Sequence, residues 1–152
     1  MKNFKSFILE KLQKINSKNS PDISKKRKLD TSNIRNAYYK VIPYTTTNPR
    51  NESMHYNKMH SYKDKGSKPE RLINSIKTKE KLIMRWYVAI IIGWTDCALA
   101  FRDAIIDRGY LDADTLDLYI LDRLKIFRGK PKENIEAYLD ELNIDYDEFI
   151  NS

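Results

Sequence analysis

The chain contains 152 residues, of which 41% are hydrophobic and 32% are charged, and its formal net charge is +7. Since domains usually contain about 100–150 residues, we expect one modest domain with an arm and not two independent domains. The single cysteine excludes a framework of internal disulfides, and four glycines and five prolines are few for a protein of many short strands and turns.

The charge is distributed unevenly along the sequence. Residues 1–85 contain 21 Lys and Arg against 7 Asp and Glu, a net charge of +14, whereas residues 86–152 contain 7 against 14, a net charge of −7. A surplus of positive charge attracts polyanions, and each phosphate that it neutralises releases counterions. We therefore expect nucleic acid as the partner of the first part. The alternative is that the acidic part packs against the basic part and the two fields largely cancel.

The N-terminal segments predict short elements joined by a basic linker. Apolar residues recur at helical spacing in residues 3–16, which predicts a short amphipathic helix, and they never form an apolar run long enough for a secretion signal. Residues 17–31 have no apolar period and include KKRK, so we expect a mobile linker. KKRK is typical of a phosphate-contacting cluster, of an import signal in a nucleated host, or of a solvated charge run. Residues 34–47 fit either a short helix or an extended segment, and residues 48–65 indicate a loop.

A long helix is predicted in the middle of the chain. Ser67 and Glu70 have the S-x-x-E spacing of a capping box, so a helix should begin at Lys68. Apolar residues then recur every three or four positions, and Gly109 is suited to end the helix. A helix of about 40 residues would measure roughly 60 Å, so we expect a break in residues 93–96.

The most apolar window, residues 86–101, has to be weighed as a membrane segment. It is shorter than the ~20 residues that cross a bilayer, and it contains Asp96, whose charge is costly there. We therefore expect no membrane span but a central helix that other helices surround. A carboxylate in that setting needs a partner, and we expect either Arg102 or a basic residue from the first half of the chain.

Three short helices are predicted after Gly109. Asp112 or Asp114 can cap the first, and helical spacing assigns the core positions. These positions are Leu118, Leu121, Leu124 and Phe127 before a stop at Gly129, then Ile135, Tyr138, Leu139 and Leu142 in a helix from Pro131, then Tyr146, Phe149 and Ile150 in a terminal stub. The pattern predicts an all-α protein, a small helical bundle around a long central helix with an extended basic N-terminal arm. Residues 1–66 would form the N-terminal helix and a partly mobile arm, and residues 67–152 the helical domain.

Several segments together resemble phage late-gene transcription regulators of the ArpU/RinA type. They are an N-terminal helix, YTTTNPRNES, DKGSKPERLINSIKTKEKLI and FRGKPKENIEAYLDELNID, and the resemblance covers roughly residues 60–150. It implies a DNA-binding activator with a C-terminal helix-turn-helix like that of sigma factors. The matching positions are Tyr138, Leu142 and Ile144 as core, Asn143 at the tight turn and Asp145 as cap of the second helix.

The sequence departs from that pattern in two places. Leu139 stands where such motifs have a small residue, and the would-be recognition helix, residues 146–152, carries Asp147 and Glu148 and no Lys or Arg. A duplex would repel these carboxylates. We therefore expect any DNA contact to lie elsewhere.

The candidate nucleic-acid-binding residues are cations of the first part. They are Lys25, Lys26, Arg27 and Lys28 as a flexible arm, with Lys63, Lys65, Lys68, Arg71, Lys77, Lys79 and Lys81. Five tyrosines lie among these charges and could stack on unpaired bases or pack on the sugar-phosphate backbone; the alternative is packing within the protein surface. They are Tyr38, Tyr39, Tyr44, Tyr56 and Tyr62.

The sequence contains no constellation that predicts catalysis. His55 and His60 are near Asp64 but lack the further ligand of a closed zinc site, and Cys97 lies in the apolar window without a histidine at helical spacing. The chain also lacks GxGxxG, GxxxxGK[ST], HExxH and GxSxG. We expect neither an enzyme nor a metal or cofactor site.

These features together favour a phage-type protein that binds nucleic acid, duplex DNA in particular, and regulates transcription in the cytoplasm of a host cell. The second part of the chain would supply a dimer or polymerase contact. The alternatives are a protein-interaction module that inhibits or recruits a host factor, and a virion component that contacts packaged nucleic acid.

Overall fold

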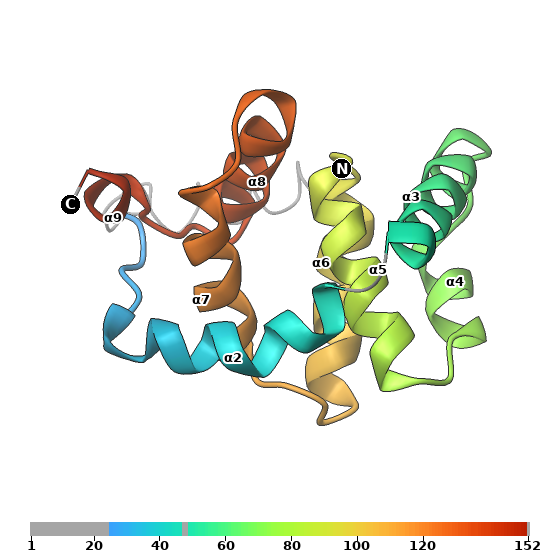
Figure 1. The fold of residues 1–152 in the computed structure, drawn as a ribbon, viewed down its shortest axis with the longest axis horizontal. Coiled ribbons are helices and arrows are strands. Elements are labelled where there is room, and N and C mark those ends of the chain that lie inside the picture. The colour runs from blue at the N-terminus through green and yellow to red at the C-terminus, as the bar shows by residue number, and fades with distance from the viewer. Residues whose placement is uncertain (1–24, 47–48, 152) are drawn as a thin grey trace, which may run out of the picture.

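A computed structural model describes residues 25–46 and 49–151 of the chain. Its elements in order are η1 (Thr31–Asn33), α2 (Ile34–Thr45), α3 (Pro49–Asp64), α4 (Pro69–Ser75), α5 (Lys79–Ile91), α6 (Thr95–Asp107), α7 (Ala113–Leu124), α8 (Gly129–Glu141) and α9 (Asp147–Ile150), as Figure 1 shows. The described residues contain no strand apart from one isolated bridge, so the all-α class is confirmed. The helix predicted in residues 3–16 lies outside the described residues, as do residues 17–24 of the linker.

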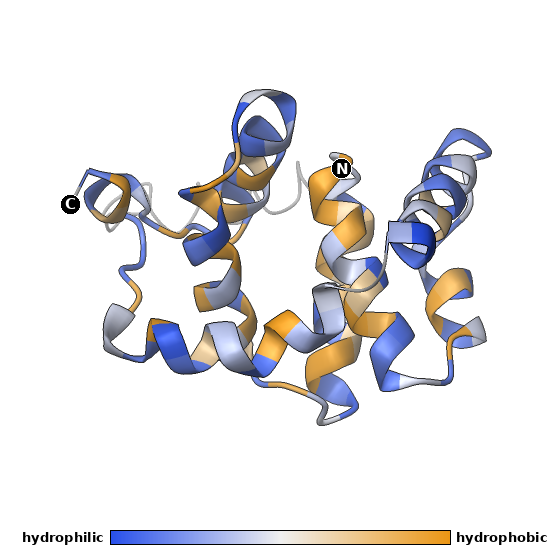
Figure 2. Cartoon of the chain, viewed as in Figure 1, coloured by the Kyte–Doolittle hydropathy of each residue, from blue (hydrophilic) through white to orange (hydrophobic). Residues whose placement is uncertain are grey.

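Helix α5 forms the centre of the core. Every residue from Leu82 to Ile91 is buried, and α5 packs against α2, α3, α6 and α8. Hydrophobic residues are concentrated on α5 and α6 in Figure 2. The first part of the apolar window, residues 86–91, is therefore explained by burial on all faces of a central helix, whereas residues 95–101 belong to α6, which is buried on one side. Within the described residues, no helix is long and apolar enough to cross a membrane.

The predicted long helix is three helices, α4, α5 and α6. The break between α5 and α6 lies in the expected region, because Gly93 has φ +85 and the amide of Trp94 turns back to the carbonyl of Ala89. The break at residues 76–78 was not expected. There the Arg108 guanidinium donates to the carbonyls of Ile76 and Ile73, at 2.8 and 3.0 Å. A distant side chain thus satisfies the end of α4.

The capping box predicted at Ser67 is wrong. Lys68 is the N-cap residue of α4 and no side chain caps the helix, which begins at Pro69. The amide of Ser67 instead donates to the carbonyl of Tyr62, at 2.9 Å, as part of the turn that ends α3. The next helix has the side-chain cap, since the Thr78 hydroxyl accepts from the amide of Lys81.

Residues 48–65, predicted as a loop, contain α3, so that prediction is wrong. The buried residues of α3 are His55 and Met59, four positions apart, and most of the remaining residues are polar. Such a narrow apolar stripe gives no helical period, and packing on α5 decides the structure. Residues 34–45, for which a helix or an extended segment was open, form α2, which packs against α7 and α5.

The C-terminal helices follow the prediction with two corrections. Asp112 caps α7 as expected, because its carboxylate accepts from the amide of Thr115 at 2.8 Å. Gly129 does not stop that helix, which ends at Leu124, but is the first residue of α8.

Asp96 of α6 is exposed and is not paired with Arg102, so the predicted ion pair is wrong. The partner of Arg102 is Asp117, described below.

We predict that Gly93→Ala destabilises the protein more than Gly66→Ala. Both glycines have positive φ, +85 and +74, and this backbone costs roughly 1–2 kcal/mol for other residues. A Cβ at Gly93 would also lie 2.9 Å from Oδ1 of Asn134, whereas a Cβ at Gly66 meets nothing within 4 Å. Urea unfolding measures both losses, and equal losses would contradict the close contact.

Candidate nucleic-acid interface

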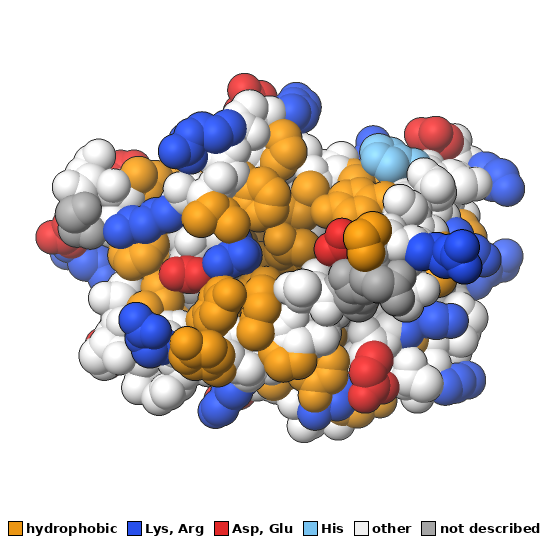
Figure 3. Space-filling model, in the orientation of Figure 1, with side chains coloured by type: hydrophobic (Ala, Val, Ile, Leu, Met, Phe, Trp, Pro, Cys, Tyr) orange, Lys and Arg blue, Asp and Glu red, His pale blue; other side chains and the backbone are white. Residues whose placement is uncertain are grey.

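Seven predicted cations lie on the end of α3, on α4 and its flanking connections, and in the first turn of α5. We call them the basic surface: Lys63, Lys65, Lys68, Arg71, Lys77, Lys79 and Lys81. All are exposed except Lys79, which is half-buried. Figure 3 shows Lys and Arg side chains gathered over the end that carries α3 and α4.

The basic surface keeps its positive charge. Within the described parts of the chain, none of its seven cations forms an ion pair with a carboxylate. Lys77 donates to the carbonyl of Asn74 at 3.0 Å, and the Lys79 ammonium lies 5.2 Å from the ring centroid of Tyr44. Residues 58–81 contain eight Lys and Arg against three Asp and Glu. The local surplus is therefore available to an anionic ligand.

The other predicted cations, in KKRK, are arranged differently. Arg27 forms a parallel bridge with Ile144, in which its amide donates to Asn143 and its carbonyl accepts from Asp145, both at 2.8 Å. Figure 1 shows this first described segment beside α9. The neighbouring ammonium groups pair with carboxylates of the second part, Lys26 with Asp140 at 3.2 Å and Lys28 with Glu148 at 2.7 Å.

The prediction of a free, flexible arm at residues 25–28 is therefore corrected. The segment is extended and basic, but backbone hydrogen bonds hold it on the chain and acidic side chains neutralise three of its four cations. The alternative that the acidic part of the chain packs against the basic part and cancels its charge therefore applies to KKRK. It does not apply to the basic surface, whose cations have no such partners in the described residues.

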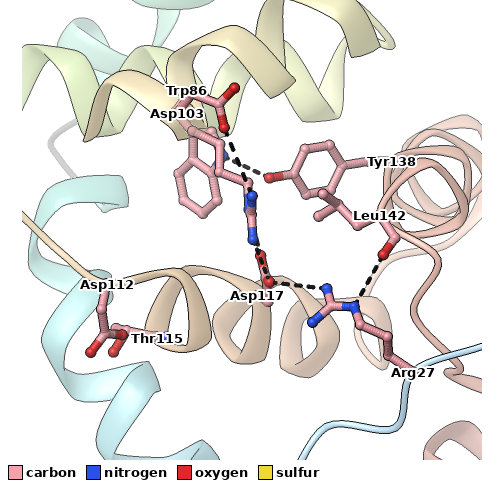
Figure 4. A network of polar contacts seen from close by, with 9 residues as sticks. Arg27, Trp86, Asp103, Asp112, Thr115, Asp117, Tyr138 and Leu142 are labelled. Atoms are coloured by element: carbon pink, nitrogen blue, oxygen red, sulfur yellow. Dashed lines mark hydrogen bonds and ion pairs between the residues drawn. The ribbon is translucent and has the colours of Figure 1, made fainter. Parts of the chain in front are cut away.

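A buried carboxylate, Asp117, connects this segment to the helices. Asp117 is fully buried and accepts two hydrogen bonds from Arg102, at 2.8 and 2.7 Å. Arg27 approaches the same carboxylate at 3.5 Å and donates through Nε to the carbonyl of Leu142 at 3.3 Å, as Figure 4 shows. A buried charge is tolerated only when it is paired and hydrogen-bonded, so this network is structural.

The helix-turn-helix-like positions of α8 and α9 are only partly as the resemblance implies. Asn143 occupies the tight turn with φ +59, and Asp145 accepts from the amide of Asp147 at 3.2 Å. Helix α9, however, contains four residues, and its Glu148 binds the protein's own Lys28. No basic recognition helix is present among the described residues of this region.

Four of the five tyrosines are at least half-buried and pack within the protein. The Tyr38 ring packs against Tyr119 and against the guanidinium of Arg123, which is 5.1 Å from its ring centroid. Burial raises the pKa of Tyr56 to about 12. Tyr39, at 59% exposure, is the one that a base could stack on, so the packing alternative describes the others better.

His55 was predicted in a loop but is a buried residue of α3. Its Nδ1 accepts a hydrogen bond from Nε of Arg85 at 3.2 Å. The two residues are 30 positions apart, and no spacing in the sequence connects them. The described residues bring together no group of three His, Cys, Asp or Glu that could hold a metal ion.

Cys97 is fully buried in α6. Burial raises the pKa of its thiol to about 12, so the thiol stays protonated at neutral pH. Because the thiolate is the nucleophile, this side chain is inert in the folded protein.

We predict a loss of stability in mild acid that depends on His55. Burial, followed by the charges of Arg85, Lys81 and Lys58, lowers the pKa of His55 below its ordinary 6.5. The unfolded chain therefore binds a proton more readily, and the free energy of unfolding falls as the pH decreases through 6.5. Urea unfolding at about pH 7.5 and 5.5 measures the difference. It should shrink in His55→Gln and persist in the exposed control His60→Gln; an unchanged slope in His55→Gln would contradict the assignment.

Comparison of the chain with described protein families, with curated proteins and with solved structures found no match. The resemblance to ArpU/RinA regulators therefore stays a prediction.

Proposed function

We propose that this protein binds nucleic acid, duplex DNA in particular, through the basic surface of α3, α4 and α5. The observation that carries the proposal is the difference between two groups of cations. Three of the four cations of KKRK are paired with the chain's own carboxylates, whereas the seven of the basic surface have no ion-pair partner in the described residues. Lysine and arginine side chains that keep their charge are the groups that contact phosphates.

The geometry favours contact with the backbone over readout of bases. The cations are spread over the end of α3, the short helix α4, the connections beside it and the first turn of α5, and are not concentrated along one recognition helix. Binding through phosphates positions a protein on DNA without sequence information. A role in transcription regulation in a phage-infected host would then require a partner that supplies the specificity.

A protein-interaction module is the second candidate. Tyr39 and Ile126 are large apolar side chains with 59% and 56% exposure, and aromatic side chains are enriched in protein interfaces. A pull-down that recovers one host protein after nuclease treatment would favour this function.

The proposal predicts DNA binding that weakens steeply with salt. If the basic surface neutralises about six phosphates, the affinity should fall by roughly a thousandfold between 50 and 200 mM salt. Filter binding of a labelled duplex at these two concentrations measures the change. Absent binding at the lower concentration, or binding that salt does not weaken, would refute the proposal.

A further inference from the structure

Arg85 of α5 is a buried cation without a carboxylate partner among the described residues. Arg85 is only 6% exposed, and its side chain contacts α3, which packs against α5. Nε donates to Nδ1 of His55 at 3.2 Å, and the guanidinium carbon lies 5.9 Å from the ring centroid of Tyr62. Arg102, a cation of the same core, has Asp117 as counter-ion. Since a buried charge is costly unless it is paired, the position of Arg85 calls for an anion.

The free end of this guanidinium is not sealed inside the protein. Its terminal nitrogens form no hydrogen bond with the described residues. Among the described residues, however, Nε of Arg123 is the one fully buried side-chain nitrogen or oxygen that lacks a hydrogen-bond partner. The terminal nitrogens of Arg85 are therefore not completely buried, although the residue as a whole is 6% exposed.

The groups around this pair are positive. Lys81 precedes Arg85 by one turn of α5, Lys58 follows His55 by one turn of α3, and the charges of all three cations act on His55. No carboxylate is among the groups that shift the His55 pKa. The nearest acidic residue along α3 is Glu52, whose charge acts on Tyr56 and Tyr87.

We propose that Arg85, His55, Lys81 and Lys58 form a binding site for one phosphate group at the junction of α3 and α5. The inference rests on the proposed function, because the phosphate it assigns to this site is one of the nucleic-acid backbone. Lys81 belongs to the basic surface, so the site is continuous with it. A guanidinium that is already oriented by His55 loses little side-chain freedom on binding, and it presents paired donors to phosphate oxygens.

The hydrogen bond between the two side chains couples this site to pH. Neutral His55 uses Nδ1 as an acceptor for Arg85, but a protonated imidazole has two donors and no acceptor. Protonation therefore breaks the bond and leaves two adjacent cations, which a phosphate between them stabilises. It follows that phosphate binding and proton uptake at His55 promote one another.

The test follows the imidazole nitrogens of His55 by NMR between about pH 5 and 8 in the native chain. The chain is measured alone, with inorganic phosphate and with a short DNA duplex. We expect the titration midpoint of His55 to move upward with both probes and that of exposed His60 to stay unchanged. If the duplex moves the His55 midpoint by about one pH unit, the proton affinity of His55 changes about tenfold. Linkage then requires the duplex affinity to be about tenfold higher at the acidic end of the pH range than at the alkaline end. His55→Gln retains an acceptor for Arg85 but does not titrate, so it should abolish the increase.

The outcomes separate this inference from the proposed function. Salt-dependent DNA binding with an unmoved His55 midpoint would overturn the phosphate site and leave the proposed function standing. A midpoint that moves with inorganic phosphate, without DNA binding, would support the site and overturn the proposed function. Midpoints that move with neither probe would overturn the inference outright. Arg85→Lys adds a check if it folds, since a lysine cannot present paired donors and should weaken phosphate binding.

Discussion

Replacing Asp117 with alanine is expected to lower the free energy of unfolding by about 3–5 kcal/mol. Its carboxylate is fully buried and accepts one hydrogen bond from Arg102 on each oxygen. Nη2 of Arg27 lies 3.5 Å from Oδ2 of the same carboxylate. Removing it leaves the Arg102 guanidinium, whose side chain is 13% exposed, without its counter-ion inside the protein. Urea unfolding of the variant and the native chain measures the loss.

Asp103→Ala is the matched control for this prediction. Asp103 approaches the same Arg102 at 4.0 Å, but its side chain is 74% exposed. Exposed pairs at such distances contribute less than about 1 kcal/mol, so the control should unfold almost like the native chain. A loss in Asp117→Ala as small as that of the control would show that the buried network does not hold the helices together.

Combined replacement of Lys77, Lys79 and Lys81 with alanine is expected to remove most of the affinity for duplex DNA. These ammonium groups have no carboxylate partner in the described residues, and each lysine that contacts a phosphate contributes about one to the slope of log affinity against log salt. The slope should therefore become shallower by about three. Filter binding across a salt series gives both quantities, and thermal unfolding verifies that the variant folds without the Lys79–Tyr44 contact.

The matched control for the lysines is the combined replacement of Lys26, Lys28 and Lys130 with alanine. It changes the net charge by the same three units, but these ammonium groups are paired with Asp140, Glu148 and Glu133. We expect its affinity and salt slope to stay close to those of the native chain. An equal loss in both triple variants would mean that net charge alone, and not the basic surface, accounts for binding.

Elements with local signals were predictable from the sequence. The apolar period of α5, the helix break near Gly93 and the cap of α7 by Asp112 depend on residues within one or two turns of one another. The core positions Leu118, Leu121 and Leu124 follow from the same spacing and are buried.

Elements that depend on distant partners were not predictable. The end of α4 is completed by Arg108, which is 32 and 35 positions away from the carbonyls it binds. Helix α3 has too few apolar residues for a period and is determined by packing on α5. Tertiary contacts of this kind override local propensity.

The candidate site likewise has features that the sequence predicts and features that it does not. Charge counting finds the lysines of the basic surface, because a surplus of cations is visible in the sequence. It cannot distinguish them from those of KKRK, whose carboxylate partners lie 114 and 120 positions away. The contact of Arg85 with His55 spans 30 positions and carries no sequence signal.

A two-dimensional ¹H–¹⁵N NMR titration of the native chain with a short DNA duplex tests the central claim most directly. The claim is that the basic surface meets phosphates while the paired cations of residues 25–28 do not. We predict that amide signals of residues 58–85 shift on titration and that those of residues 25–28 and 140–148 stay in place. Shifts confined to residues 25–28 and 140–148, or no shifts anywhere, would contradict it.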